Sequence, residues 1–166
     1  MLLIGLRILV LLSIFFTNTM VFAATTTANL PISATVISAC SIGTVVGVAF
    51  GNYDPTSATP NNATGTIPVT CTNGTTYNIG LGAGTFAGAT VTTRRMTGVP
   101  PGTPLSYFLY RDAGRTLNWG TTIGTDTVAL TGTGVAQSTT VYGQIPALQA
   151  VTAGTYSDTV LITVTF

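Results

Sequence analysis

The chain has 166 residues, and its only charged side chains are five arginines and four aspartates, because lysine, glutamate and histidine do not occur. Without an imidazole there is no Ser-His-Asp or Cys-His catalytic site, and two cysteines are too few for a usual zinc site. Five cations against four anions make no basic surface for nucleic acid, so we expect a protein that is not an enzyme, binds no nucleic acid and needs no metal or cofactor.

Residues 1–23 have the features of a secretory signal peptide. Arg7 lies in a short n-region, residues 8–16 are apolar, and residues 21–23 end with small or aliphatic residues at the two positions that signal peptidase reads. A membrane anchor is the alternative, but the run is short and no basic stop-transfer flank follows it. We therefore expect cleavage after Ala23 or Ala24 and export of the remaining chain.

The next segment, residues 24–37, alternates between two faces as a β-strand does. Pro31 lies on its more polar face and cannot donate a ladder hydrogen bond, which argues against a central position in a sheet. We expect this segment to be a strand that precedes the body of the protein. Its other face carries Thr26, Ala28, Leu30, Ile32, Ala34 and Val36.

Cys40 and Cys71 are the only cysteines and lie 31 positions apart. An even number of cysteines behind a signal peptide indicates a disulfide formed in an oxidising compartment. A reactive or metal-binding pair is the alternative, but neither cysteine belongs to a Cys-x-x-Cys motif. Closing a loop of this size contributes about 3–4 kcal/mol in the chain-entropy model.

The remainder of the chain is predicted to be β throughout. Its segments are rich in Thr, Val, Ile, Tyr and Phe, no stretch has a helical period, and Gly, Pro, Asn and Asp recur between the segments. Asn73-Gly74 suits a type I′ hairpin turn. Strands at this spacing predict an all-β antiparallel sandwich. The expected strands are 30–37, 45–50, 66–71, 77–81, 90–96, 105–111, 125–130, 138–147 and 156–166.

The last of these strands, residues 156–166, has the longest alternating pattern. Its opposite face is mainly threonine. From the pattern alone, this segment and residues 24–37 are either the first and last strands of a closed sandwich or two strands that need partners from elsewhere. The apolar face of the last strand carries Tyr156, Val160, Ile162, Val164 and Phe166.

The charged residues are assigned to turns and to the surface. Arg111, Asp112 and Arg115 are expected in a solvated turn, which is favoured over an ion pair or an anion site. Arg94 and Arg95 are expected to be a solvated surface pair. The four aspartates lie in or near turns, where Asp bonds locally, and this interpretation is favoured over a two-carboxylate glycosidase site.

Six motifs together resemble a known family. They are SACSI at 38–42, AFGNYDP at 49–55, GTIPVTC at 65–71, LSYFLYRDAGR at 105–115, VYGQIP at 141–146 and AGTYSDTVLITVTF at 153–166. In order and spacing they resemble spore coat protein U domain proteins and the related subunits of archaic chaperone–usher pili. The resemblance runs from about residue 28 to the end of the chain.

This resemblance implies an incomplete immunoglobulin-like antiparallel β-sandwich with one disulfide, completed by donor-strand exchange. A periplasmic chaperone would lend the missing strand, and the N-terminal extension of a neighbouring subunit would replace it at an outer-membrane usher. The predicted parts are a signal peptide at 1–23, a donor-strand extension at 24–37 and a pilin domain at 38–166.

The resemblance also assigns roles to the two alternating segments. The apolar faces defined above would be the donor strand (Thr26, Ala28, Leu30, Ile32, Ala34, Val36) and the acceptor or chaperone-binding strand (Tyr156, Val160, Ile162, Val164, Phe166). Basic residues of the chaperone would hold the Phe166 carboxylate. Pro31 and the small side chains of Thr26 and Ala28 leave the donor register open by about one pocket.

The expected function is that of a structural subunit of a secreted surface pilus, acting in adhesion and biofilm formation. Its partners would be the chaperone, the usher and neighbouring subunits, and its location the cell surface, reached through the periplasm. The alternatives are a spore or cell-surface coat protein of the same fold and a secreted adhesive module that acts alone.

Overall fold

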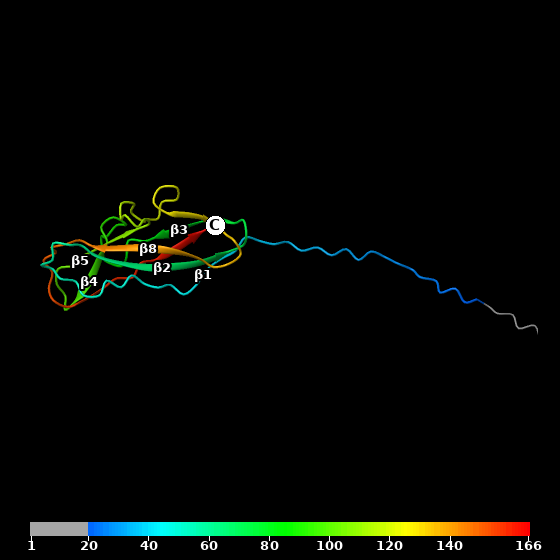
Figure 1. Ribbon diagram of the computed structural model, residues 1–166, viewed down its shortest axis with the longest axis horizontal. Helices are drawn as coiled ribbons and strands as arrows, with labels where there is room; N and C mark the ends of the chain where they lie inside the picture. Colours follow the sequence, from blue (N-terminus) through cyan, green and yellow to red (C-terminus); the bar gives the residue numbers. More distant parts are fainter. Residues whose placement is uncertain (1–19) are drawn as a thin grey trace, which may run out of the picture. The chain divides into compact units, whose positions relative to one another are not determined.

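The computed structural model describes residues 20–166, in which all ten regular elements are β-strands. Residues 1–19, most of the predicted signal peptide, lie outside the described residues. The described part contains no helix with the length and apolar character needed to span a bilayer. Val36–Phe166 form a compact unit, which contains all ten strands (Figure 1).

The first sheet is antiparallel and has the strand order β1-β2-β8-β6. Its centre is the long pair β2 (Asn61–Cys71) and β8 (Gln137–Ile145), which run side by side in Figure 1. β1 (Cys40–Ile42) and β6 (Phe108–Tyr110) pair with the outer sides of β2 and β8. Alternate residues of β2 and β8 are buried, as the period of a strand with one core face requires.

Two three-stranded sheets supply the other strands. One has the order β10-β3-β7, with β10 at Ile162–Thr165, β3 at Thr76–Leu81 and β7 at Val128–Thr131. The other has the order β5-β4-β9. These strands are short: β5 is Leu105–Ser106, β4 is Arg95–Val99 and β9 is Thr155–Ser157. The all-β antiparallel fold predicted from the sequence is confirmed.

The core joins the inner faces of these sheets around Trp119. The indole is fully buried, and its Nε1 donates a 2.8 Å hydrogen bond to the Ile79 carbonyl. The polar atom of this large side chain is therefore satisfied inside the core, as burial demands. The other buried apolar residues are Ile67, Val69, Cys71, Tyr77, Ile79, Leu81, Met96, Leu105, Tyr107, Leu109, Val141 and Ile145.

The expected strand at 45–50 is wrong as a regular strand. Only Val46 bridges to β2, exchanging two backbone hydrogen bonds with Thr66 of 3.0 and 2.9 Å. Pro68 interrupts the ladder between this bridge and β1, because it has no N–H to donate and only accepts a bond from Gly43. Residues 45–50 therefore follow the edge of the first sheet without a continuous ladder.

The expected strand at 90–96 is also mostly wrong, since β4 begins at Arg95. Its threonines form a turn instead: the Thr93 N–H donates to the Thr90 carbonyl, and the Thr93 hydroxyl accepts a bond from the Thr90 N–H. Such side-chain bonds to the local backbone compete with a sheet ladder.

Arg94, expected on the surface, is fully buried. Its guanidinium donates four hydrogen bonds of 2.7–2.8 Å, each to a backbone carbonyl. The acceptors are the carbonyls of Leu81, Gly82, Val91 and Trp119. The surface assignment is therefore wrong for Arg94, whereas Arg95 is exposed as expected.

Two expected strands are each divided into two. Residues 105–111 form β5 and β6, separated by Tyr107, whose N–H donates to the Arg94 carbonyl. Residues 156–166 form β9 and β10, which pair with different sheets. The interruption between β9 and β10 contains Asp158.

The type I′ hairpin predicted at Asn73-Gly74 is wrong. This turn joins β2 to β3, which belong to different sheets, and it is closed by a 3.0 Å bond from the Thr75 N–H to the Thr72 carbonyl. Gly74 has φ +81°, whereas Asn73 is not among the residues with positive φ. A positive φ at the second central residue alone is the geometry of a type II turn.

Candidate functional site

The compact unit contains an open groove of about 860 Å³. Residues 45–53 and Pro55 form one side, and residues 151–158, Val160 and Ile162 form the other. Its floor is made by core side chains, each at most 8% exposed, so the groove reaches down to the hydrophobic core. The floor residues are Ile67, Leu81, Met96, Leu105, Tyr107, Leu109, Val141 and Ile145.

Both sides of the groove are incompletely paired strand edges. β10 is the outermost strand of its sheet and pairs only with β3. On the opposite side, residues 45–50 make the single bridge at Val46. Unpaired N–H and C=O groups along such an edge are a template for another strand.

The two sides turn apolar side chains toward the core. Val48 and Phe50 on one side, and Val160, Ile162 and Val164 on the other, are half-buried against the core cluster. Residues 45–50 also approach β8 closely: a Cβ on Gly143 would lie 2.5 Å from a Val48 methyl and 2.8 Å from the Phe50 ring. Gly143 thus allows this side of the groove to pack on the sheet.

The residues expected to form the acceptor strand are not all in the same environment. Tyr156, Val160 and Ile162 line the groove. Val164 packs against the core beyond them, and Phe166 is 59% exposed. Tyr156 belongs to β9, and the interruption between β9 and β10 separates it from Val160, Ile162 and Val164. Its hydroxyl donates a 2.7 Å hydrogen bond to the Thr152 carbonyl.

The groove contains one polar contact that the sequence analysis missed, between Tyr107 and Asp158. The Tyr107 hydroxyl donates a 2.6 Å hydrogen bond to Asp158 Oδ2, while Asp158 Oδ1 accepts bonds from the Thr85 N–H and hydroxyl, both 2.7 Å. Asp158 has the same parity as Tyr156, Val160 and Ile162. That parity was the available signal for an inward position.

These bonds change the pKa of both groups. Burial raises the pKa of Tyr107 far above its usual range, and its hydrogen bond to the Asp158 carboxylate raises it further. For Asp158, burial works to raise the pKa, but the bonds from Tyr107 and Thr85 outweigh it and lower the pKa. A neutral phenol and a carboxylate are thus the stable pair at neutral pH.

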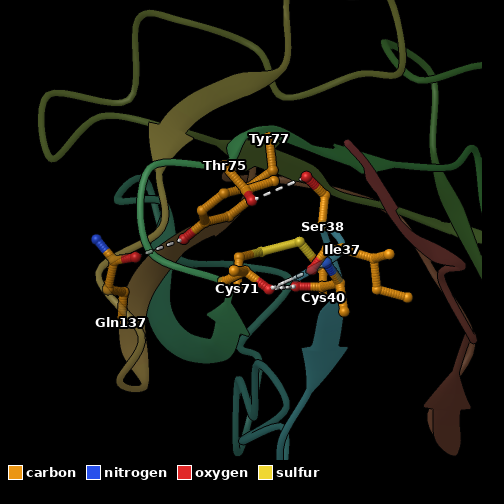
Figure 2. Close-up of a disulfide and its surroundings, with 9 residues drawn as sticks. Ile37, Ser38, Cys40, Cys71, Thr75, Tyr77 and Gln137 are labelled. Atoms are coloured by element: carbon orange, nitrogen blue, oxygen red, sulfur yellow. Dashed lines mark hydrogen bonds between the residues drawn. A yellow bond between two sulfur atoms is a disulfide. The ribbon is translucent and has the colours of Figure 1, made fainter. Parts of the chain in front are cut away.

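The predicted disulfide between Cys40 and Cys71 is confirmed and joins the start of β1 to the end of β2 (Figure 2). Thr72, which follows Cys71, binds the residues that precede Cys40. Its N–H and hydroxyl bond to the backbone of Ala39, and its hydroxyl also donates to the Ile37 carbonyl. Figure 2 also shows the 3.3 Å bond from the Thr75 hydroxyl to Ser38. The backbone is therefore fixed from about Ile37 onward.

Residues 20–36 form no strand, so the strand expected at 30–37 is wrong within this chain. The side chains of Leu30, Ile32 and Val36 are 81%, 89% and 84% exposed. An alternating strand sequence becomes a strand only when another strand satisfies its backbone groups. The remaining members of this face, Thr26, Ala28 and Ala34, are exposed too.

Within residues 20–166 no group of three metal-ligating side chains is found. A comparison with protein-family models matches residues 26–163 to the Spore Coat Protein U domain. The chain belongs to the spore coat protein U domain family. The resemblance found from the sequence motifs is thereby confirmed.

Two further comparisons find a protein similar in sequence and a solved structure similar in fold. Protein U of Myxococcus xanthus is 44% identical over 158 residues, which is 87% of each chain. The fold is similar, with a TM-score of 0.57 and 22% identity, to a chain in the "CsuC-CsuE chaperone-tip adhesion subunit pre-assembly complex from archaic chaperone-usher Csu pili of Acinetobacter baumannii". That likeness covers 80% of this chain and 40% of the chain in that complex.

Proposed function

We propose that this protein is a structural subunit of a secreted chaperone–usher-type pilus that polymerises by donor-strand complementation and serves adhesion and biofilm formation. The observation that carries the proposal is the open groove, with apolar floor residues between two strand edges that lack a partner. A single added strand would both fill the groove and pair with a strand edge, since its alternate side chains enter the groove while its backbone bonds to the edge.

The N-terminal extension of a neighbouring subunit is the proposed donor. Leu30 and Ile32 are the largest side chains on its apolar face, and both are exposed. Burying each of them contributes about 1.5–3 kcal/mol, to which new backbone bonds add. Thr26, Ala28, Ala34 and Val36 would occupy the shallower positions on either side.

The acceptor surface is assigned to the C-terminal segment. Tyr156, Val160 and Ile162 would contact the donated strand directly, because they line the groove. Val164 and Phe166 would extend this strand beyond the groove, where basic residues of a periplasmic chaperone would bind the Phe166 carboxylate. The chaperone would fill the groove first, and the usher would exchange it for the next subunit.

Export is part of the same proposal. Residues 1–23 would direct the chain into the periplasm, and the Cys40–Cys71 disulfide is of the kind that forms in such an oxidising compartment. The finished fibre would lie on the cell surface.

A second candidate function, a spore or cell-surface coat protein, is favoured by the family itself, whose description names the spore coat. The two candidates share strand exchange and differ in the form of the assembly. Immunogold labelling of cells and spores separates them, because a pilus gives labelled fibres and a coat gives a continuous labelled layer.

The proposal is tested by expressing the chain with and without a periplasmic chaperone and usher, and by running unboiled samples on a denaturing gel. We expect the chaperone to be required and a ladder that collapses on heating, because the donated strand becomes part of a folded core. Deleting residues 24–32 should abolish the ladder and leave a chaperone-bound monomer. A chain that needs no chaperone and forms no ladder contradicts the proposal.

A further inference from the structure

The outer face of the first sheet carries three aromatic side chains, Phe108, Tyr110 and Tyr142, here called the aromatic face. Phe108 and Tyr110 flank the buried Leu109 on β6, so both turn away from the core. Tyr142 alternates in the same way on β8 and lies directly opposite Tyr110. All three are half-buried, which leaves part of each ring open to solvent.

The aromatic face is extended by amide side chains on the neighbouring strands. The Phe108 and Tyr110 ring centroids are 6.1 Å apart with an interplanar angle of 36°. Phe108 pairs across the strands with Gln144, whose side-chain Nε2 donates a 3.1 Å hydrogen bond to Asn62 Oδ1 on β2. Rings and amides therefore follow one another across three strands of a single sheet face.

A cation lies at the edge of the aromatic face. The Arg115 guanidinium carbon is 5.9 Å from the centre of the Tyr142 ring, and its Nε donates a 3.2 Å bond to the Gly143 carbonyl. Arg115 has φ +54°, a left-handed conformation that costs energy for a residue with a side chain. The strained backbone of this turn thus holds the Arg115 guanidinium near the Tyr142 ring.

The other arginines of the compact unit are engaged elsewhere. Arg94 is buried, Arg111 donates to the carbonyls of Thr125 and Thr127, and Arg95 lies over Phe86, 5.7 Å from the ring centre. Arg115 is therefore the cation that the aromatic face presents.

The chain's own carboxylates are a poor match for this cation. Asp112, in the same turn, accepts bonds from Thr116 and Leu117. Asp54, Asp126 and Asp158 likewise accept hydrogen bonds from residues near them in the fold. Each Asp of one copy is already bonded, and the Phe166 carboxylate is assigned to assembly under the proposed function, so another kind of molecule is the better source of a complementary anion.

We propose that the aromatic face binds a polysaccharide whose sugar rings carry carboxylate groups. The apolar C–H face of a pyranose ring packs on an exposed aromatic ring, as other apolar surface does. The side-chain amides of Gln144 and Asn62 form hydrogen bonds with the sugar hydroxyls. Arg115 pairs with a carboxylate through a charge-assisted hydrogen bond, which a neutral sugar does not form. The proposal does not depend on strand exchange.

The test is affinity chromatography of the exported protein on columns that carry immobilised polygalacturonate or its methyl ester. These two polymers share a backbone and differ in charge. We expect retardation by the acid and much less by the ester. Arg115→Asn should weaken binding by about tenfold or more, because a hydrogen bond to a charged group is lost. Asn tolerates a left-handed φ, so the turn is retained.

Arg95→Asn is the matched control, because it removes the same charge from a similar arginine–aromatic contact outside the aromatic face. Tyr142→Ala provides a second variant, which should also lose binding. Equal losses in the two arginine variants, equal retardation by acid and ester, or no retardation at all overturns the proposal. Self-association that Arg115→Asn removes also overturns it, since the occupant is then a second copy.

Discussion

The Tyr107 hydroxyl donates a 2.6 Å hydrogen bond to Asp158, a residue 51 positions later that lies between the two C-terminal strands. This bond joins the floor of the groove to one of its sides and holds the segment that leads into β10. Because Asp158 also binds Thr85, it joins three parts of the chain at the point where β9 and β10 diverge to different sheets.

Asp158→Asn should destabilise the subunit by about 1–3 kcal/mol, because an amide replaces a charged acceptor of several bonds and leaves donors poorly matched. Urea unfolding followed by near-UV circular dichroism measures the loss. Asp54→Asn is the control, since Asp54 is exposed and bonds only within its own turn. An equal effect of the two changes contradicts the role given to Asp158.

Alkaline pH should destabilise the protein through Tyr107. The folded-state pKa of Tyr107 is raised above its ordinary value of 10.0, so its contribution to stability is complete below pH 10 and is lost as the pH rises further. The unfolding free energy measured between pH 8 and 11 should fall more steeply for the native chain than for Tyr107→Phe. Parallel curves for the two proteins would show that another group titrates.

Arg94→Met should cost about 3–5 kcal/mol or prevent folding, because two buried and two partly buried carbonyls lose their donor. Its neighbour Arg95 is exposed, so Arg95→Met should change stability by about 0.5 kcal/mol at most. Thermal unfolding of both variants gives the comparison. A mild effect of Arg94→Met would mean that the carbonyls find water or other donors.

Val160→Asp should block assembly, because it places a charge in the groove that the donated strand is proposed to fill. The adjacent Leu161 is 73% exposed and has the opposite parity, so Leu161→Asp should assemble normally. The heat-sensitive ladder on unboiled gels is the measurement. Loss of the ladder in both variants, or in neither, contradicts the assigned acceptor face.

Replacing both cysteines by serine should lower the free energy of unfolding by about 3–4 kcal/mol, as expected for opening a loop of this length. The double change avoids leaving a free thiol. Urea unfolding of the variant, beside the reduced native chain, checks the value. If reduction does not destabilise the native chain, the disulfide has no such role.

The sequence was most informative where its signal is local. Alternation predicted the inward face of residues 160–164, because the period of a strand can be read from one segment alone. The cysteine count behind a signal peptide predicted the Cys40–Cys71 pair, because disulfides form in oxidising compartments. Asp158 was missed, although it has the parity of Val160, because an aspartate is usually assigned to a turn.

Other features depend on contacts between distant residues. Arg94 is buried because four carbonyls, from residues 81 to 119, converge on its guanidinium, and arginine is rarely buried without such partners. Asn73-Gly74 has the sequence of a hairpin turn, but the strands it joins pair with others in different sheets. The groove is lined by segments from residues 45 to 162, so the pattern of any single segment does not predict it.

The disulfide has a mechanical consequence for a fibre. If a neighbouring subunit binds residues 24–36 and the fibre is pulled, the force reaches the compact unit near Cys40. The disulfide then transmits this force to Cys71 at the end of β2. The three residues of β1 are then relieved of the force. The force is borne instead by β2, whose register with β8 extends from Asn61 to Val69, so that many backbone bonds resist the pull together.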